Sequence, residues 1–95
     1  MNACLIPGPQ VAGRQVVTIE GMAQDTALDP LQRALVDHGA IQCGFCTPGL
    51  VMSAKALLAN SCQLTCEQAR EGLAGNLCRC TGYTKIMAAV LAAGR

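Results

Sequence analysis

Apolar residues recur at helical spacing through most of the chain, and this pattern predicts four helices. The expected helices cover residues 30–38, 47–60, 65–72 and 81–94. The first is expected to begin at Pro30, because Asp29 and Gln32 have the spacing of an N-terminal capping box. The fourth has the most regular apolar stripe, made of Tyr83, Ile86, Met87, Val90 and Leu91. We therefore expect an all-α domain.

The first 21 residues follow a different pattern. Short strands are expected at residues 3–6 and 15–20, separated by turn-forming proline and glycine. Two strands alone cannot bury a face. We interpret residues 1–21 as the end of a β domain and residues 22–95 as the four-helix domain.

The helical region repeats itself weakly. In each half a helix is followed by a glycine, two cysteines, a threonine and a second helix. The cysteines are Cys43 and Cys46 in the first half and Cys78 and Cys80 in the second. Each pair lies at a corner between helices, with Thr47 or Thr81 expected at the next N-cap. This register predicts two helix hairpins related by a pseudo-twofold axis, with four sulfurs meeting near it.

The composition excludes several classes of protein. About half of the residues are hydrophobic, but Phe45 and Tyr83 are the only aromatic ones, so a thin aliphatic core is expected. The net charge is +1 and the basic residues are scattered, which argues against nucleic-acid binding. No apolar run approaches the roughly 18 residues of a membrane span. Seven cysteines without a visible export signal indicate a reducing, cytoplasmic location, where they are metal ligands or thiols.

Three kinds of chemistry fit four cysteines at two helix corners. A structural zinc module for subunit assembly commonly uses two Cys-x-x-Cys knuckles, whereas one pair here is Cys-x-Cys. A redox-active disulfide is expected in a βαβ setting. A [2Fe–2S] cluster is the favoured alternative. Its ligands would be four thiolates, because Rieske ligation needs two histidines and His38 is the only one. The pattern by itself leaves zinc and thiol redox chemistry open.

Two longer motifs contain these cysteines. They read Gln-Cys-Gly-Phe-Cys-Thr-Pro-Gly at residues 42–49 and Gly-Asn-Leu-Cys-Arg-Cys-Thr-Gly-Tyr at residues 75–83. With them the chain closely resembles the iron–sulfur subunit of the molybdenum hydroxylases. That family includes xanthine dehydrogenase, aldehyde oxidoreductase and aerobic carbon monoxide dehydrogenase. The resemblance spans essentially the whole chain.

The resemblance implies a function for the cysteines. The cluster ligands would be Cys43, Cys46, Cys78 and Cys80, which match those of the [2Fe–2S] cluster nearest the molybdenum cofactor. Gln42 and Cys80 match positions that also contact molybdopterin across the subunit interface. Electrons would enter from a molybdopterin-binding large subunit and leave through a second cluster to the FAD of a medium subunit. The chain would be the electron-transfer component of an oxidoreductase, with no catalytic residue of its own.

The chain departs from the family at its N-terminal end. The second cluster normally lies in a ferredoxin-like domain with four cysteine ligands. Cys4 matches the last of these, and no others are present before it. We therefore expect one cluster, with Cys4 an orphan ligand, and interpret the chain as a fragment. Cys62 and Cys66 are expected to be thiols outside the site.

Overall fold

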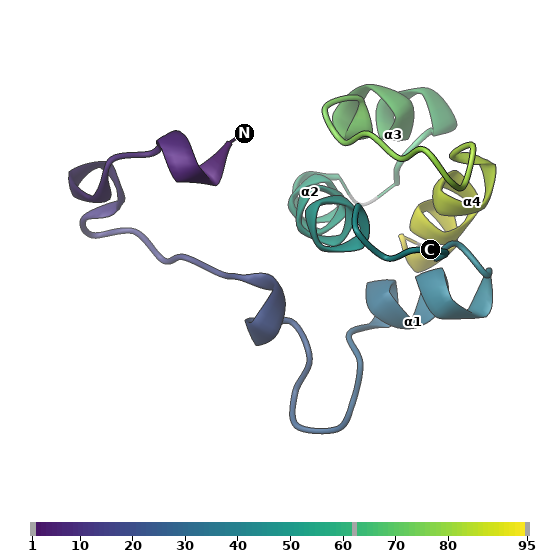
Figure 1. The fold of residues 1–95 in the computed structure, drawn as a ribbon, viewed down its shortest axis with the longest axis horizontal. Helices are drawn as coiled ribbons and strands as arrows, with labels where there is room; N and C mark the ends of the chain where they lie inside the picture. Colours follow the sequence, from purple (N-terminus) through teal and green to yellow (C-terminus); the bar gives the residue numbers. More distant parts are fainter. Residues whose placement is uncertain (1, 62, 95) are drawn as a thin grey trace.

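A bundle of helices forms one side of the molecule, and the N-terminal segment extends beside it (Figure 1). The computed structural model describes residues 2–61 and 63–94. Within these ranges there are four α-helices: α1 (Pro30–Asp37), α2 (Thr47–Asn60), α3 (Cys66–Leu73) and α4 (Thr84–Ala93). The all-α class is confirmed. No helix in the described ranges is both long and apolar enough to span a membrane.

The helix boundaries agree with the sequence pattern except at the start of α4. Helix α4 begins at Thr84, because Gly82 (φ 66°) and Tyr83 (φ 69°) have left-handed backbone conformations that interrupt a right-handed helix. The N-cap expected at Asp29 is confirmed, but those expected at Thr47 and Thr81 are wrong. Cys46 itself is the N-cap of α2, and Tyr83 is the N-cap of α4.

The two predicted strands are not found, so the β remnant is not confirmed. Residues 2–21 contain instead three short 3₁₀ turns: η1 (Ala3–Leu5), η2 (Gly8–Val11) and η3 (Ile19–Gly21). The β-branched residues Val16 and Val17 are 64% and 51% exposed. They favour an extended backbone, but a strand also needs a neighbour to satisfy its peptide groups. No strand is present in the described residues to serve as that neighbour.

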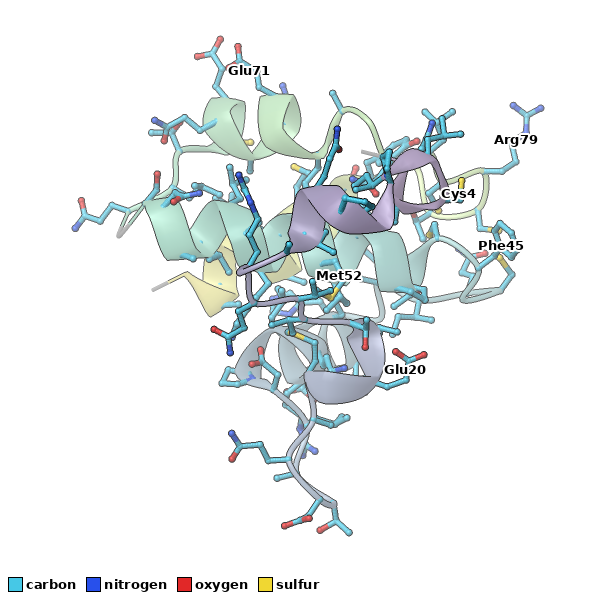
Figure 2. All side chains as sticks on the ribbon, turned by 90° about the vertical axis from the view of Figure 1, so that its left-hand side faces the viewer. Cys4, Glu20, Phe45, Met52, Glu71 and Arg79 are labelled. Carbon is cyan, nitrogen blue, oxygen red and sulfur yellow. The ribbon has the colours of Figure 1, made fainter. Side chains whose placement is uncertain are left out.

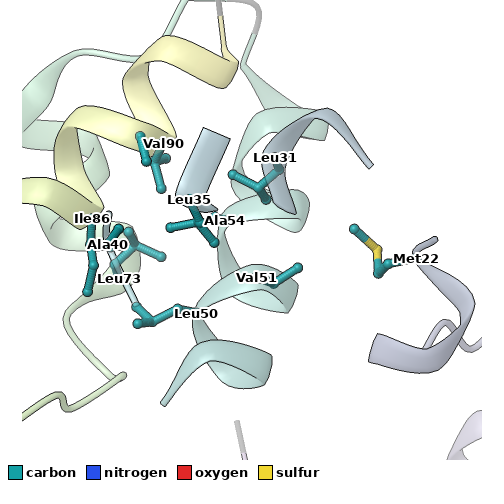
Figure 3. Packing of buried hydrophobic residues seen from close by; sticks show 11 residues of the cluster. Met22, Leu31, Leu35, Ala40, Leu50, Val51, Ala54, Leu73, Ile86 and Val90 are labelled. Atoms are coloured by element: carbon teal, nitrogen blue, oxygen red, sulfur yellow. The ribbon is translucent and has the colours of Figure 1, made fainter. Parts of the chain in front are cut away.

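The N-terminal segment is attached to the bundle near η3. Met22 is 8% exposed and belongs to the core, and Ile19 packs against the same cluster. Figure 3 shows Met22 beside the buried face of α2. This attachment is apolar and is confined to η3 and Met22. No side chain of residues 2–18 is buried.

The core is aliphatic and draws on all four helices (Figure 3). Its fully buried members of largest volume are Leu31, Val51, Ile86 and Val90. Ile86 and Val90 come from the stripe predicted on α4, while Tyr83 and Met87 of that stripe are partly buried. Burial of each such aliphatic side chain contributes about 1.5–3 kcal/mol. Alanines complete the packing, which allows the helices to approach closely.

The helix contacts agree with the expected pseudo-twofold relation. The most extensive contacts join α1 to α4 and α2 to α3. An axis that exchanges the first helix hairpin with the second would convert one of these contacts into the other. The contacts between the two hairpins are therefore more extensive than those within them.

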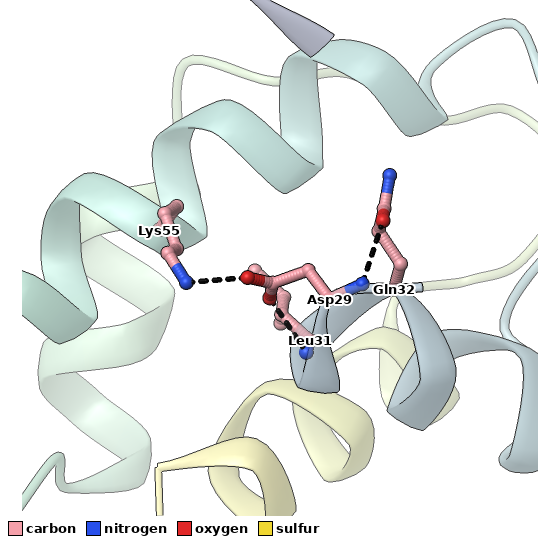
Figure 4. Close-up of polar contacts among 4 residues, drawn as sticks. All are labelled: Asp29, Leu31, Gln32 and Lys55. Carbon is pink, nitrogen blue, oxygen red and sulfur yellow. Dashed lines mark hydrogen bonds and ion pairs between the residues drawn. The ribbon is translucent and has the colours of Figure 1, made fainter. Parts of the chain in front are cut away.

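Side-chain caps fix the starts of α1 and α3. The Asp29 backbone N–H donates to Gln32 Oε1 (3.0 Å), and Asp29 Oδ1 accepts from the Leu31 N–H (3.0 Å), as Figure 4 shows. Asp29 also forms an ion pair with Lys55 of α2, with Nζ and Oδ2 2.6 Å apart. Thr65 and Gln68 form a matching capping box on α3. Asp29 thus both starts α1 and connects it to α2.

We predict that Asp29→Ala lowers the free energy of unfolding by about 1–2 kcal/mol, because it removes an N-cap and an ion pair. Burial would raise the pKa of Asp29, but Lys55 and the Leu31 N–H outweigh it and hold the pKa below its ordinary value. The stability from Asp29 is thus present above the unfolded pKa of about 3.9 and is lost as the pH falls through the lower folded pKa. Urea unfolding of the parent chain and of Asp29→Ala at pH 7 measures the loss of unfolding free energy. The same comparison at pH 3 measures how far the contribution of Asp29 falls in acid.

The matched control is Asp37→Ala. Asp37 pairs with Arg33 on the exposed surface of α1, with both side chains well solvated. Its removal is expected to change the unfolding free energy by less than about 0.5 kcal/mol. Equal effects of the two substitutions would contradict the role given to Asp29.

Candidate metal centre

The two cysteine-containing loops meet at one end of the bundle. One loop joins α1 to α2, and the other joins α3 to α4. Phe45 and Arg79, one from each loop, project at the same edge of the molecule (Figure 2). The sulfurs of Cys43 and Cys80 lie 3.6 Å apart. The structure thus brings together cysteines that are 37 positions apart in the chain.

The four cysteines are arranged as two pairs. Cys43 and Cys80 form an exposed pair, while Cys46 and Cys78 are half-buried. Burial raises the pKa of Cys46, and the interaction with Cys78 raises it further. The same interaction contributes to lowering the pKa of Cys78. Cys43 and Cys78 also interact electrostatically, so the two pairs lie close enough to influence each other.

Each pair contains one thiol that ionises more readily than its partner. The backbone N–H of Phe45 lowers the pKa of Cys43, and Cys80 adds to this effect. The interaction with Cys43 in turn raises the pKa of Cys80. The hydroxyl of Thr81 is the main cause that lowers the pKa of Cys78, to about 7. The loops therefore favour thiolate at one sulfur of each pair, and thiolate is the form that binds metal.

A closed ring of hydrogen bonds holds the second loop. Thr81 Oγ1 donates to Cys78 Sγ (3.1 Å) and accepts from the Tyr83 N–H (3.3 Å). The Cys78 N–H donates to Tyr83 Oη (2.7 Å), which completes the ring. A left-handed conformation is costly for a residue with a side chain. Tyr83 is held in it because its hydroxyl and its backbone N–H are both engaged in this ring.

Sequence reasoning missed the roles of Thr81 and Tyr83. Thr81 was expected to cap a helix and Tyr83 to belong to the apolar stripe, but both contact Cys78 by hydrogen bonds. The available signal was Gly82, which interrupts the helical pattern between them. A glycine in the first turn of a predicted helix indicates a loop conformation that delays the helix start.

Further polar contacts join the second loop to the first hairpin. Gln42 Nε2 donates to the Cys80 carbonyl oxygen (3.2 Å), and Asn76 Nδ2 donates to Ser53 Oγ of α2 (2.8 Å). Gln42 therefore supports the position of Cys80. Its predicted contact with molybdopterin stays a prediction.

The remaining predicted residues lie outside these pairs. Cys4 is exposed in η1, and Cys66 is exposed at the start of α3. Cys62 falls outside the described residues. His38 is the C-cap of α1, and its Nδ1 lies 2.8 Å from the Ala34 carbonyl oxygen. Across residues 2–61 and 63–94, no three Cys, His, Asp or Glu side chains are grouped around a point that could hold a single metal ion.

Two large apolar side chains next to the cysteines are almost fully exposed. Phe45, between Cys43 and Cys46, is 94% exposed, and Leu77, directly before Cys78, is 84% exposed. Side chains of this size normally contribute to a core or an interface. We call Phe45 and Leu77 the apolar rim of the cysteine site.

Comparison with known proteins identifies the domain. The family described as "[2Fe-2S] binding domain" matches residues 18–91, which include all four cysteines of the site. The chain belongs to this family. The domain is therefore a [2Fe–2S] domain, and the resemblance to the iron–sulfur subunits of the molybdenum hydroxylases is confirmed by the relatives below.

Curated relatives are similar over nearly the whole chain. The xanthine dehydrogenase iron-sulfur-binding subunit of Escherichia coli O157:H7 is 46% identical over 93 residues, which cover 96% of this chain and 58% of the relative. The nicotine 6-hydroxylase small subunit of Paenarthrobacter nicotinovorans is 50% identical over 91 residues, which cover 96% and 54%. The chain thus spans about half the length of these relatives.

Solved structures share the fold. Quinoline 2-oxidoreductase from Pseudomonas putida 86 is 40% identical with a TM-score of 0.90, over 99% of this chain and 59% of that one. Aldehyde oxidoreductase from Desulfovibrio gigas is 44% identical with the same TM-score, over 97% of this chain and 10% of that one.

The residues of the site fit the group that the family binds. A four-thiolate [2Fe–2S] cluster takes its ligands from cysteine, two for each of its two irons. The two pairs of sulfurs, one in each half of the site, supply that donor set. The Thr81 hydroxyl donates to Cys78 Sγ, and the Phe45 N–H lowers the pKa of Cys43, so each pair has one group that stabilises a thiolate ligand.

We predict that Gly82→Ala destabilises the second loop by roughly 1–2 kcal/mol, since alanine is strained at a φ of 66°. Gly75→Ala in the same loop is the control. An added Cβ meets nothing within 4 Å at either position, but only Gly82 has a positive φ. Since neither substitution adds a steric contact, the difference between the two variants in urea unfolding measures the backbone strain at position 82. A Gly75→Ala variant as unstable as Gly82→Ala would contradict this explanation.

Proposed function

We propose that the chain is the electron-transfer component of a molybdenum hydroxylase and holds the [2Fe–2S] cluster nearest molybdopterin. The observation that carries this proposal is the arrangement of four cysteine sulfurs as two interacting pairs where the two hairpins meet. The similarity to iron–sulfur subunits of several oxidoreductases supports it.

In this proposal each pair of cysteines holds one iron. Cys43 and Cys80 would bind the exposed iron, and Cys46 and Cys78 the half-buried one. Each iron would then be held by one cysteine from each loop, so the two hairpins are tied together through the site. When bound, the cluster supplies a centre that accepts and returns one electron.

The position of the site suggests how electrons enter. The two cysteines of the exposed pair and the apolar rim, Phe45 and Leu77, are all exposed on the two loops that form the site. We propose that the molybdopterin-binding large subunit covers this rim, with Gln42 and Cys80 in contact with the pterin. Substrate oxidation would then take place on that subunit, in the cytoplasm, and this chain would receive the electrons.

Electrons would leave toward a second cluster and the FAD of a medium subunit. Cys4 is proposed as one ligand of that second cluster, since it matches the last ligand of the ferredoxin-like domain in the family pattern. The division of the chain at residue 21 belongs to the same proposal. The [2Fe–2S] family match begins at residue 18, close to this boundary.

Anaerobic reconstitution with iron and sulfide tests the proposal. The chain is expected to bind about two irons, to absorb visible light, and to give an EPR signal after reduction with dithionite. Cys43→Ala and Cys78→Ala should each lose these signals, because each removes a ligand from a different iron.

Cys66→Ala and Cys4→Ala are matched controls, since both cysteines are exposed but lie outside the two pairs. Both variants should keep the full spectrum and iron content. A colourless chain that retains one tightly bound zinc would contradict the electron-transfer function. Loss of the spectrum in Cys66→Ala would show that the ligand assignment is wrong.

A further inference from the structure

The two threonines that follow the cysteine motifs differ in what they contact. Thr47 follows Cys46 and is the first residue of α2, whereas Thr81 follows Cys80 and lies in the loop before α4. Thr81 Oγ1 donates to Cys78 Sγ at 3.1 Å. Within the described residues, no sulfur accepts a comparable bond from Thr47. The sequence repeat is therefore asymmetric in its hydrogen bonding.

The Thr81 hydroxyl is oriented by its neighbours to donate. Its oxygen accepts the Tyr83 N–H at 3.3 Å, which leaves its own proton for Cys78 Sγ. Tyr83 is fixed in turn, because its Oη accepts the Cys78 N–H at 2.7 Å. Hydrogen bonds linked in this way polarise one another. The donor therefore reaches the sulfur preorganised, without a rearrangement when the charge on the sulfur changes.

We propose that Thr81 sets the reduction potential of the [2Fe–2S] cluster through its hydrogen bond to Cys78 Sγ. The inference rests on the proposed function, in which Cys78 is a ligand. Addition of one electron converts one ferric iron to ferrous and leaves the centre with one more negative charge, with no proton transferred. A hydrogen bond to a sulfur ligand stabilises the more negative form more strongly, and so raises the potential. Thr81 is a positioning residue that acts through Cys78.

Thr81→Val removes the hydroxyl with little change in side-chain shape, and Thr81→Ser restores the hydroxyl. Thr47→Val makes the same change at the matching position, where no sulfur loses a donor. The variants would be compared as reconstituted full chains in an anaerobic redox titration with dithionite, followed by EPR. At a fixed applied potential, Thr81→Val should show a ratio of reduced to oxidised cluster about tenfold lower than the parent chain, which is about 59 mV for a one-electron couple.

Thr81→Ser and Thr47→Val should both titrate like the parent chain. Pulsed EPR in D₂O adds a second measurement, because an exchangeable deuteron near the reduced cluster should be lost in Thr81→Val and kept in Thr81→Ser. An unchanged potential in a cluster-loaded Thr81→Val variant would overturn the inference, as would an equal shift in Thr47→Val. A parent chain that forms no [2Fe–2S] cluster would instead refute the proposed function.

Discussion

The packing of one hairpin on the other is the contact on which the rest of the structure depends. Because α1 packs on α4 and α2 on α3, the ends of the two hairpins that carry the cysteine loops face each other. The loops are then held by Gln42, which reaches the Cys80 carbonyl, and by Asn76, which reaches α2. Direct contact of Cys43 with Cys80 is the result. The core that supports these loops has no buried aromatic ring, so a cluster that ties the two hairpins together would add to the stability.

The second loop achieves its shape at a local cost. Gly82 and Tyr83 both have left-handed backbones, and for tyrosine this conformation is unfavourable by about 1–3 kcal/mol. The hydrogen bonds of Tyr83 to Cys78 and Thr81 offset that cost. In the first loop the left-handed conformation occurs only at glycines, Gly39 and Gly44, where it costs little, and Cys46 leads directly into α2. The two halves share a sequence pattern but reach their sulfur positions by different means.

Much of the helical domain follows from local sequence. The caps of Asp29 and Thr65 depend on residues three positions away, so a local pattern is sufficient to find them. The cysteines could be recognised as one site because their motifs are long and specific. The strands at the N-terminus were predicted wrongly, since β-branched residues indicate extended backbone but not whether a neighbouring strand exists. The pairing of Cys43 with Cys80 and the hydrogen bond of Thr81 arise from the meeting of distant loops, which local patterns do not encode.

Cys43 and Cys80 are open to solvent at the tip of the bundle. Iron and sulfide can therefore reach the folded site from outside, without unfolding of the hairpins. The proposed large subunit would cover the same surface, because the exposed Phe45 and Leu77 belong to the two loops that carry these cysteines. If the proposed large subunit covers this surface, the metal would have to be inserted before the subunits assemble. A chain that docked empty would have its entrance sealed, and the finished enzyme would lack an electron carrier that could no longer be supplied.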